Sequence, residues 1–238
     1  MRVYEAFCGI GGFSLGFQRA GFEIVGGCEI DPYARAVYRK NFGIEPDGDI
    51  RAIESVSADI ICGGFPCQPF SVAGQRKQKE DERHLWPEML RVVEASKPEW
   101  VVGENVHGIW PHIDSICQDL EDVGFQTLPI CLSARAFGAA HLRRRIFFIA
   151  NSKRNQLQRG ETNAAERPEF GGEEQLSRLL FPRVRDALSA ARVWRADHGV
   201  SSRVDIHRNK AIGNAIVPQI AEWIAERIKE VEAAGDLI

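Results

Sequence analysis

Residues 62 to 71, Cys-Gly-Gly-Phe-Pro-Cys-Gln-Pro-Phe-Ser, place one cysteine in a setting that suits a nucleophile. Pro66 and Pro69 flank Cys67 and restrict the backbone, while the preceding glycine pair lets the chain approach a ligand closely. A single cysteine is more often a small buried hydrophobe, but this one follows an apolar run and has no apolar periodicity around it. We therefore interpret Cys67 as a displayed nucleophile, which reacts as its thiolate.

An acidic residue ends another apolar run, in Glu104-Asn105-Val106. The carboxyl ends of parallel strands meet at one edge of a sheet, so we expect Glu104 to lie near Cys67. A carboxyl group in that position can act as a general acid or base. The alternative, an ordinary loop or helix-start acid, is less favoured beside such a cysteine.

Three arginines precede the apolar strand at 146–149, in His141-Leu142-Arg143-Arg144-Arg145. Because side chains alternate along a strand, Arg143 and Arg145 should face the same side. The pair could stabilise negative charge near the thiolate, whereas Arg144 is interpreted as a basic strand edge.

A glycine-rich segment, Phe7-Cys8-Gly9-Ile10-Gly11-Gly12-Phe13-Ser14, joins the first expected strand to the first helix. Its glycines allow a tight turn against a cofactor, but the spacing is not GxGxxG, so an ordinary strand-to-helix turn is the alternative. Glu29 ends the second strand, where a nucleotide-binding fold places a carboxylate for ribose hydroxyls. Asp49 follows in Gly48-Asp49-Ile50, and either acid alone would be interpreted as a solvated loop residue.

These segments resemble, in the same order, the sequence blocks of the cytosine-C5 DNA methyltransferases. Gly64 to Ser71 resembles the nucleophile loop, the FxGxGG segment resembles the first block, and Lys210 to Pro218 resembles the last block. The resemblance covers about residues 1–150 and 199–238. It implies a Rossmann-like fold and the transfer of a methyl group to C5 of cytosine.

The resemblance implies S-adenosylmethionine as methyl donor, S-adenosylhomocysteine as product, and no metal. Glu29 would bind the ribose and Asp49 the adenine amino group. The implied cofactor residues are Phe7, Gly9, Ile10, Gly11, Gly12, Glu29, Ile30, Asp49, Ile50, Pro66 and Asn214.

The implied catalytic residues are Cys67, Glu104, Arg143 and Arg145. Attack of the Cys67 thiolate on C6 of cytosine makes C5 able to accept a methyl group. Glu104 would bond N3 and the exocyclic amine, and Arg143 would contact O2, with Arg145 in a more structural role. The family usually has Gln where this chain has His141, so the role of His141 stays open.

The base must leave the duplex before this chemistry can occur. We expect the polar stretch after Cys67 to close on DNA and fill the vacated space, although a solvated loop would have the same composition. The expected DNA-binding residues are Gln68, Ser71, Arg76 and Lys77.

Alternating apolar runs and amphipathic stretches predict a doubly wound α/β domain with a largely parallel sheet, followed by a small, irregular second domain. Strands are expected at 3–7, 23–29, 58–62, 100–104, 125–132 and 145–150. Helices are expected at 13–20, 32–42, 85–95, 109–123 and 216–233, and one or two more at 175–194.

We expect a cofactor-binding and catalytic domain at 1–150, a small target recognition region at 151–206, and a C-terminal segment at 207–238 that returns to the first domain. Residues 151–210 carry 12 Lys and Arg against 8 Asp and Glu, which favours this stretch as a polyanion surface. The family's recognition domain is usually larger. Reduced specificity, a minimal recognition element, a dimer partner and an inactive relic therefore stay open.

The chain of 238 residues, 44% hydrophobic, is long enough for one sizeable core. It has no apolar run of transmembrane length and no apolar signal core at its start, so we expect a cytoplasmic protein without membrane contact. The six cysteines show no CxxC pair and no zinc-like Cys/His spacing, which favours free thiols.

We therefore expect a DNA (cytosine-5)-methyltransferase that acts on double-stranded DNA as a monomer, with a dimer left open and a cognate restriction endonuclease as a candidate partner. A tRNA cytosine-5 methyltransferase is one alternative, although the Cys-Phe-Thr element of that group is absent. A non-catalytic module that binds DNA or S-adenosylmethionine is another. A Rossmann oxidoreductase is disfavoured by the glycine spacing and by Cys67.

Overall fold

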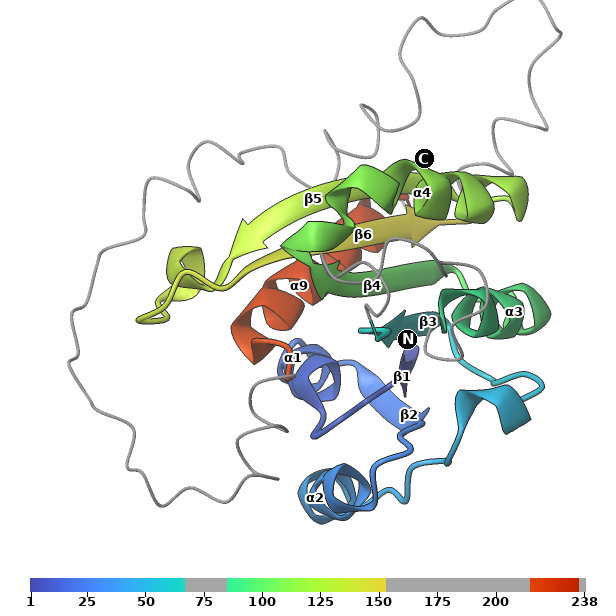
Figure 1. The fold of residues 1–238 in the computed structure, drawn as a ribbon, viewed down its shortest axis with the longest axis vertical. Helices are drawn as coiled ribbons and strands as arrows, with labels where there is room; N and C mark the ends of the chain where they lie inside the picture. Colours follow the sequence, from blue (N-terminus) through green and yellow to red (C-terminus); the bar gives the residue numbers. More distant parts are fainter. Residues whose placement is uncertain (67–84, 153–214, 236–238) are drawn as a thin grey trace, which may run out of the picture.

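One mixed sheet organises the part of the chain that the structure describes, residues 1–66, 85–152 and 215–235 of a computed structural model. Its strand order is β2-β1-β3-β4-β6-β5 (Figure 1). The strands are β1 (Arg2–Ala6), β2 (Glu23–Gly27), β3 (Ile60–Gly63), β4 (Trp100–Val106), β5 (Gln126–Ser133) and β6 (Arg144–Asn151).

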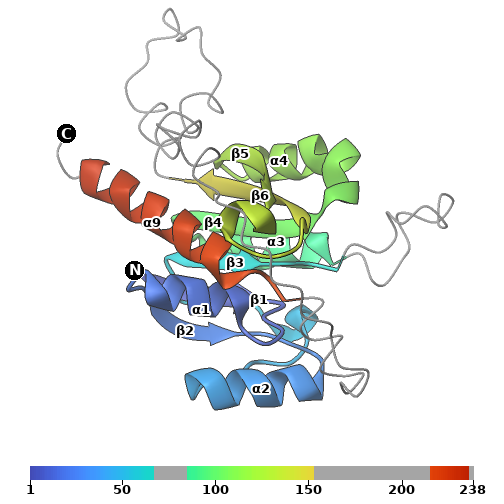
Figure 2. The same cartoon turned by 90° about the vertical axis from the view of Figure 1, so that its left-hand side faces the viewer.

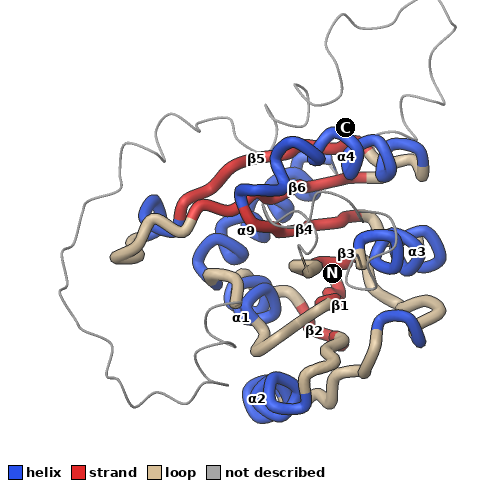
Figure 3. Tube along the Cα trace, viewed as in Figure 1, coloured by secondary structure: helices blue, strands red, loops and turns tan. Residues whose placement is uncertain are grey.

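Helices cover both faces of this sheet, as Figures 2 and 3 show. The helices are α1 (Gly12–Arg19), α2 (Pro32–Phe42), α3 (Trp86–Ser96), α4 (Ile113–Asp122) and α9 (Pro218–Gly235). Three short 3₁₀ turns are η1 (Ile50–Ala52), η2 (His107–His112) and η3 (Ala134–Phe137). Helices α1 and α9 pack on one face and α3 and α4 on the other, while α2 lies beside the β2 edge. The doubly wound α/β prediction is confirmed.

Alternation along the strands builds two hydrophobic cores. Val3 and Ile60 face α1 and α9, while their neighbours Tyr4 and Ile61 face α3 and α4. Successive residues of a strand point to opposite faces, so the central strands need apolar residues at nearly every position. This explains why they appear in the sequence as continuous apolar runs.

All six predicted strands are present, with ends within two residues of those expected. The predicted helix at 109–123 is instead the 3₁₀ turn η2 followed by α4. Pro111 lies inside η2, and a proline lacks the N–H that an α-helix would use and disfavours helical geometry at the preceding residue.

The largely parallel sheet has an antiparallel edge. Strands β1 to β4 pair in parallel, whereas β6 is antiparallel to both β4 and β5. Only residues 134–143 connect β5 to β6. This connection is too short for a crossover helix, so the second strand must run back along the first.

The predicted recognition region at 151–206, and the predicted helices at 175–194, lie almost wholly outside the described residues. Among the helices that the structure does describe, none combines the length and the apolar character needed to cross a membrane.

The C-terminal helix α9 packs tightly against α1. A Cβ on Gly16 of α1 would lie 2.5 Å from the Pro218 carbonyl oxygen and 2.6 Å from the Glu222 backbone nitrogen. Lys229 Nζ also donates to the Ala20 carbonyl oxygen at the end of α1, at 2.9 Å. Residues more than 190 positions apart in the sequence are thereby joined.

We predict that Gly16→Ala lowers the stability of the fold by about 1–3 kcal/mol, because the methyl group would meet backbone atoms that cannot rotate away. Thermal unfolding followed by circular dichroism measures the effect. Gly48→Ala is the matched control, since no atom lies within 4 Å of its Cβ position and its φ is not positive. An unchanged melting temperature for Gly16→Ala would contradict this account of the α1–α9 contact.

Candidate active site

The glycine-rich loop leaves β1 in a left-handed backbone path. Phe7 has φ 53°, Gly9 has φ 53° and Gly11 has φ 92°. A Cβ on Gly9 would meet no atom of the described residues within 4 Å, whereas one on Gly11 would meet the ring of Phe42. Positive φ in a non-glycine residue such as Phe7 is uncommon and tends to occur at ligand-binding positions.

A buried carboxylate that the sequence analysis missed holds this loop. Glu5 in β1 is 1% exposed, and its two oxygens accept hydrogen bonds from Phe13 N at 3.1 Å and Ser14 N at 2.8 Å. The N-cap residue of α1 is Gly11, which has no side chain to cap the helix. Glu5 therefore supplies the missing cap from the neighbouring strand. A single acid inside the apolar run at 3–7 was the available signal.

Glu29 connects the glycine-rich loop to the next loop of the site. Its Oε2 accepts a hydrogen bond from Gly9 N at 2.9 Å, and its Oε1 accepts one from Asp31 N at 2.8 Å. An isolated parallel bridge between Cys28 and Asp47 then brings the segment that contains Asp49 beside the end of β2. The structure thus gathers the two predicted cofactor acids at one end of the sheet.

Asp49 begins the turn η1 and pairs with Arg51. The Asp49 Oδ2 to Arg51 Nη2 distance is 2.6 Å, and hydrogen bonds from Arg51 hold the pKa of Asp49 below its ordinary value. The two predicted apolar walls differ in exposure, since Ile30 is 65% exposed whereas Ile50 is 3% exposed and packs in the core.

The described start of the nucleophile loop is fixed from two sides. Asn105 Nδ2 donates to the Phe65 carbonyl oxygen at 3.0 Å. The buried Phe65 ring packs on Trp86 at the start of α3, with ring centroids 5.3 Å apart, and Pro66 is exposed. Cys67 follows directly but lies outside the described residues. The sequence analysis assigned no role to Asn105.

Glu104 lies buried between this loop and two arginines. A Cβ on Gly64 would lie 3.0 Å from Glu104 Oε2. Arg145 forms an ion pair with Glu104, with Nε 2.9 Å from Oε1. Oε1 nevertheless accepts no well-directed hydrogen bond from the described residues. Oε1 is therefore held mainly by the charge of Arg145, while Oε2 lies on the side of Gly64.

Burial raises the pKa of Glu104 to about 7, and the charges of Arg145 and Arg143 oppose that rise. The carboxyl group therefore holds its proton to higher pH than an exposed glutamate does. The charges of both arginines act on Glu104, but Arg143 precedes β6 and has φ 22°, so the alternation expected of a strand does not extend to it. Such a balance between burial and nearby charge is typical of groups that exchange protons with a substrate.

Arg143 also ties the catalytic edge to the C-terminal segment. Its Nη2 donates to the Ala215 carbonyl oxygen at 2.9 Å, and burial lowers the pKa of its guanidinium group. The next residue, Ile216, approaches the glycine-rich loop so closely that a Cβ on Gly12 would lie 2.6 Å from its carbonyl oxygen. The described end of the predicted last block thus lies beside both Arg143 and the glycine-rich loop.

Several predicted site residues lie outside the described part of the chain, namely Cys67, Gln68, Ser71, Arg76, Lys77 and Asn214. His141 is exposed. Within residues 1–66, 85–152 and 215–235, no group of three or more His, Cys, Asp or Glu side chains could hold a metal ion.

Comparison with known proteins agrees with this geometry. The family model for C-5 cytosine-specific DNA methylases matches residues 1–196. Type II methyltransferase M.HgiBI from Herpetosiphon aurantiacus is 32% identical over 88% of this chain and 49% of its own length. Type II methyltransferase M.MspI from Moraxella sp is 37% identical over 65% of this chain and 39% of its own.

The Dnmt2 methyltransferase of S. pombe shares the fold, with a TM-score of 0.55 and 24% identity over 70% of this chain and 57% of that one. The chain spans half or less of the length of the two curated relatives. The family match nevertheless extends over most of its residues. The chain therefore belongs to the C-5 cytosine-specific DNA methylase family.

Proposed function

We propose that this protein is a DNA (cytosine-5)-methyltransferase that uses S-adenosylmethionine. The observation that carries this proposal is the buried Glu104 carboxyl, which lies between two arginines and against Gly64 of the nucleophile loop. A carboxyl group with a pKa of about 7 can both donate a proton to a ring nitrogen and accept a hydrogen bond from an amine.

The glycine-rich loop and the two acids fit the proposed cofactor. Gly9 has open space at its Cβ position and a left-handed backbone, as a loop that approaches a ligand requires. Glu29 would bind the ribose and Asp49 the adenine amino group, with Phe7, Ile30, Ile50 and Pro66 as apolar contacts and Asn214 from the last block. When bound, S-adenosylmethionine supplies an electrophilic methyl group.

The remaining steps belong to the protein's own side chains. The Cys67 thiolate would add to C6 of cytosine, while Glu104 protonates N3 and so withdraws electrons from C6. Arg143 would contact O2, and Arg145 would hold the Glu104 carboxyl in place. After methylation, a water molecule would take the C5 proton, the thiolate would leave C6, and N3 would return its proton to Glu104, which restores the aromatic ring and the free enzyme.

Double-stranded DNA is the proposed substrate, and the target base must be flipped out of the stack to reach Glu104. Gln68, Ser71, Arg76 and Lys77 are the proposed contacts on the loop after Cys67. Residues 151–206, with their basic excess, are proposed to read the bases around the target. A cytoplasmic enzyme that acts as a monomer fits this substrate.

The relatives are named Type II methyltransferases. A cognate restriction endonuclease is therefore the proposed biological partner. Its cleavage sites would be the sequences that this protein methylates.

We predict that base-resolution mapping finds 5-methylcytosine at a defined motif in DNA from a methylation-free host that expresses the wild-type chain. Cys67→Ala should abolish the signal, because the proposed C6 adduct forms on the Cys67 sulfur. Cys131→Ala is the matched control, since Cys131 is an exposed free thiol on β5 and should not affect methylation.

A folded wild-type chain that binds S-adenosylmethionine but leaves this DNA unmethylated would contradict an autonomous DNA methyltransferase. Methylation of tRNA extracted from the same host would then support the RNA alternative. Methylation that persists in Cys67→Ala would contradict the covalent mechanism while leaving the reaction itself in place.

We also predict that kcat/KM for methylation falls as the pH rises through about 7, because Glu104 must carry a proton to protonate N3. Glu104→Gln should lose this limb of the profile and react about 10²- to 10⁴-fold more slowly. Arg145→Gln should move the limb to higher pH, since Arg145 lowers the pKa of Glu104. Initial rates across the pH range, with saturating donor, measure all three. If kcat/KM of Glu104→Gln still falls at the same pH, that fall belongs to the titration of another group.

A further inference from the structure

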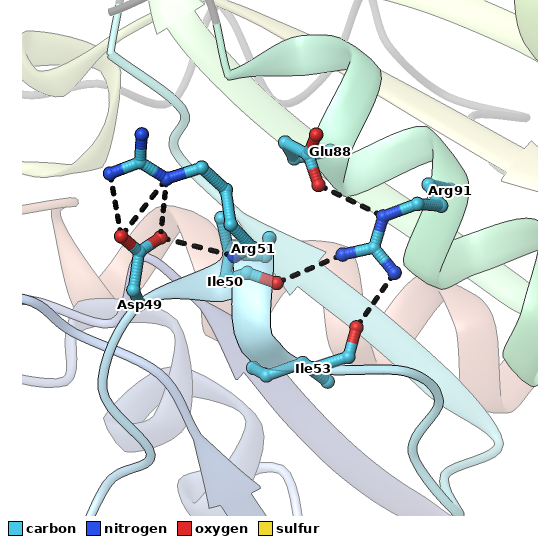
Figure 4. Close-up of polar contacts among 6 residues, drawn as sticks. All are labelled: Asp49, Ile50, Arg51, Ile53, Glu88 and Arg91. Carbon is cyan, nitrogen blue, oxygen red and sulfur yellow. Dashed lines mark hydrogen bonds and ion pairs between the residues drawn. The ribbon is translucent and has the colours of Figure 1, made fainter. Parts of the chain in front are cut away.

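Arg91 on α3 holds the turn that presents Asp49, although the sequence analysis gave this arginine no role. Its Nη1 donates to the Ile53 carbonyl oxygen at 2.7 Å, and its Nη2 donates to the Ile50 carbonyl oxygen at 3.0 Å (Figure 4). Its Nε donates to Glu88 Oε2 at 2.9 Å, on the preceding turn of the helix. One guanidinium group therefore spans two carbonyls of the loop and one carboxylate of α3.

The turn needs such an external contact. It contains only three residues, and its own backbone bonds are Ala52 N to Asp49 O at 3.0 Å and Ile53 N to Ile50 O at 3.1 Å. A single 3₁₀ turn has poor hydrogen-bond geometry and little stability by itself. Arg91 adds a second donor to the Ile50 carbonyl oxygen, which begins the turn, and a donor to the Ile53 carbonyl oxygen, which follows it.

The bonds between Asp49 and Arg51 and the burial of Ile50 act differently from Arg91. The four bonds between Asp49 and Arg51 are local and move with the turn, so they cannot fix it against the rest of the fold. The buried Ile50 side chain fixes where the turn lies. Arg91 adds the orientation of its peptide groups, and hence the direction in which Asp49 leaves the backbone.

We propose that Arg91 is a positioning residue that aligns Asp49 with the adenine amino group of the methyl donor. This inference rests on the proposed function, because it takes Asp49 as the adenine ligand. Arg91 does not itself contact the donor. It acts through the Ile50 and Ile53 carbonyls, which flank the backbone of the turn that Asp49 caps.

The same helix supports the nucleophile loop. Trp86, the first residue of α3, packs on Phe65, two residues before Cys67. Arg91 lies five residues further along the helix, at the cofactor turn. One rigid helix therefore sets the spacing between the two subsites, and a small displacement of reacting groups is costly in such reactions.

The test measures binding of two ligands to the full chain by isothermal titration calorimetry. S-adenosylhomocysteine carries the adenine amino group, and S-inosylhomocysteine carries a carbonyl oxygen there instead. A carboxylate that accepts a bond from the amine should reject the carbonyl analogue. The wild type should therefore bind S-adenosylhomocysteine more tightly, and the ratio of the two dissociation constants reports the alignment of Asp49.

Arg91→Met keeps the length of the side chain and removes its donors. We expect it to bind S-adenosylhomocysteine about tenfold more weakly and to lose most of the preference over the inosyl analogue. Glu88→Gln is the matched control, because both bonds from Arg91 to the loop carbonyls remain, and the preference should stay near that of the wild type. Arg91→Lys, which can reach one carbonyl at a time, should show an intermediate preference and serves if the Met variant does not fold.

The inference would be overturned if Arg91→Met prefers S-adenosylhomocysteine over the inosyl analogue as strongly as the wild type does. The same result in Arg91→Lys would overturn it if only that variant folds. An equal loss of affinity for both ligands would also overturn the inference, since it indicates a general structural role of Arg91. A wild-type chain that binds neither ligand would overturn the proposed function itself. The two failures are distinguished by the wild-type titration alone.

Discussion

The parallel pairing of β1, β2, β3 and β4 is the constraint on which both proposed subsites depend. Parallel strands bring their carboxyl ends to one edge of the sheet. The glycine-rich loop, Glu29, the nucleophile loop and Glu104 each follow or end one of these four strands. A shift of one pairing by a single residue would turn side chains to the opposite face and separate these groups.

Close approach of backbone segments is the second requirement, and glycine meets it at particular places. Gly12 admits the Ile216 backbone beside the cofactor loop, and Gly64 leaves room for the Glu104 carboxyl. The hydrogen bond from Arg143 to the Ala215 carbonyl oxygen then joins the C-terminal segment to the segment before β6. The C-terminal helix is therefore part of the site's framework, since α9 fixes the position of residues 215 and 216.

The sequence was sufficient to predict the strands and the order of the segments, because these follow from the periodicity of apolar residues. It did not identify Glu5, Asn105 or Arg91. These three residues act through backbone N–H and carbonyl groups of distant segments, and such partners leave no pattern of residue types. The antiparallel edge was also missed, because strand direction depends on the length of a connection and not on alternation.

Two buried carboxyl groups show how the same burial produces different roles. Burial raises the pKa of both Glu5 and Glu104 to about 7, so each favours folding less as the pH rises from about 4.5 to 7. Both oxygens of Glu5 already accept hydrogen bonds from backbone N–H groups at the start of α1. Glu104 instead has one oxygen, Oε1, that lies 2.9 Å from Arg145 Nε without a well-directed hydrogen bond from the described residues, while its Oε2 lies toward Gly64. That difference in hydrogen bonding, and not the pKa, is why we propose Glu104 and not Glu5 as the carboxyl group that acts on a flipped base.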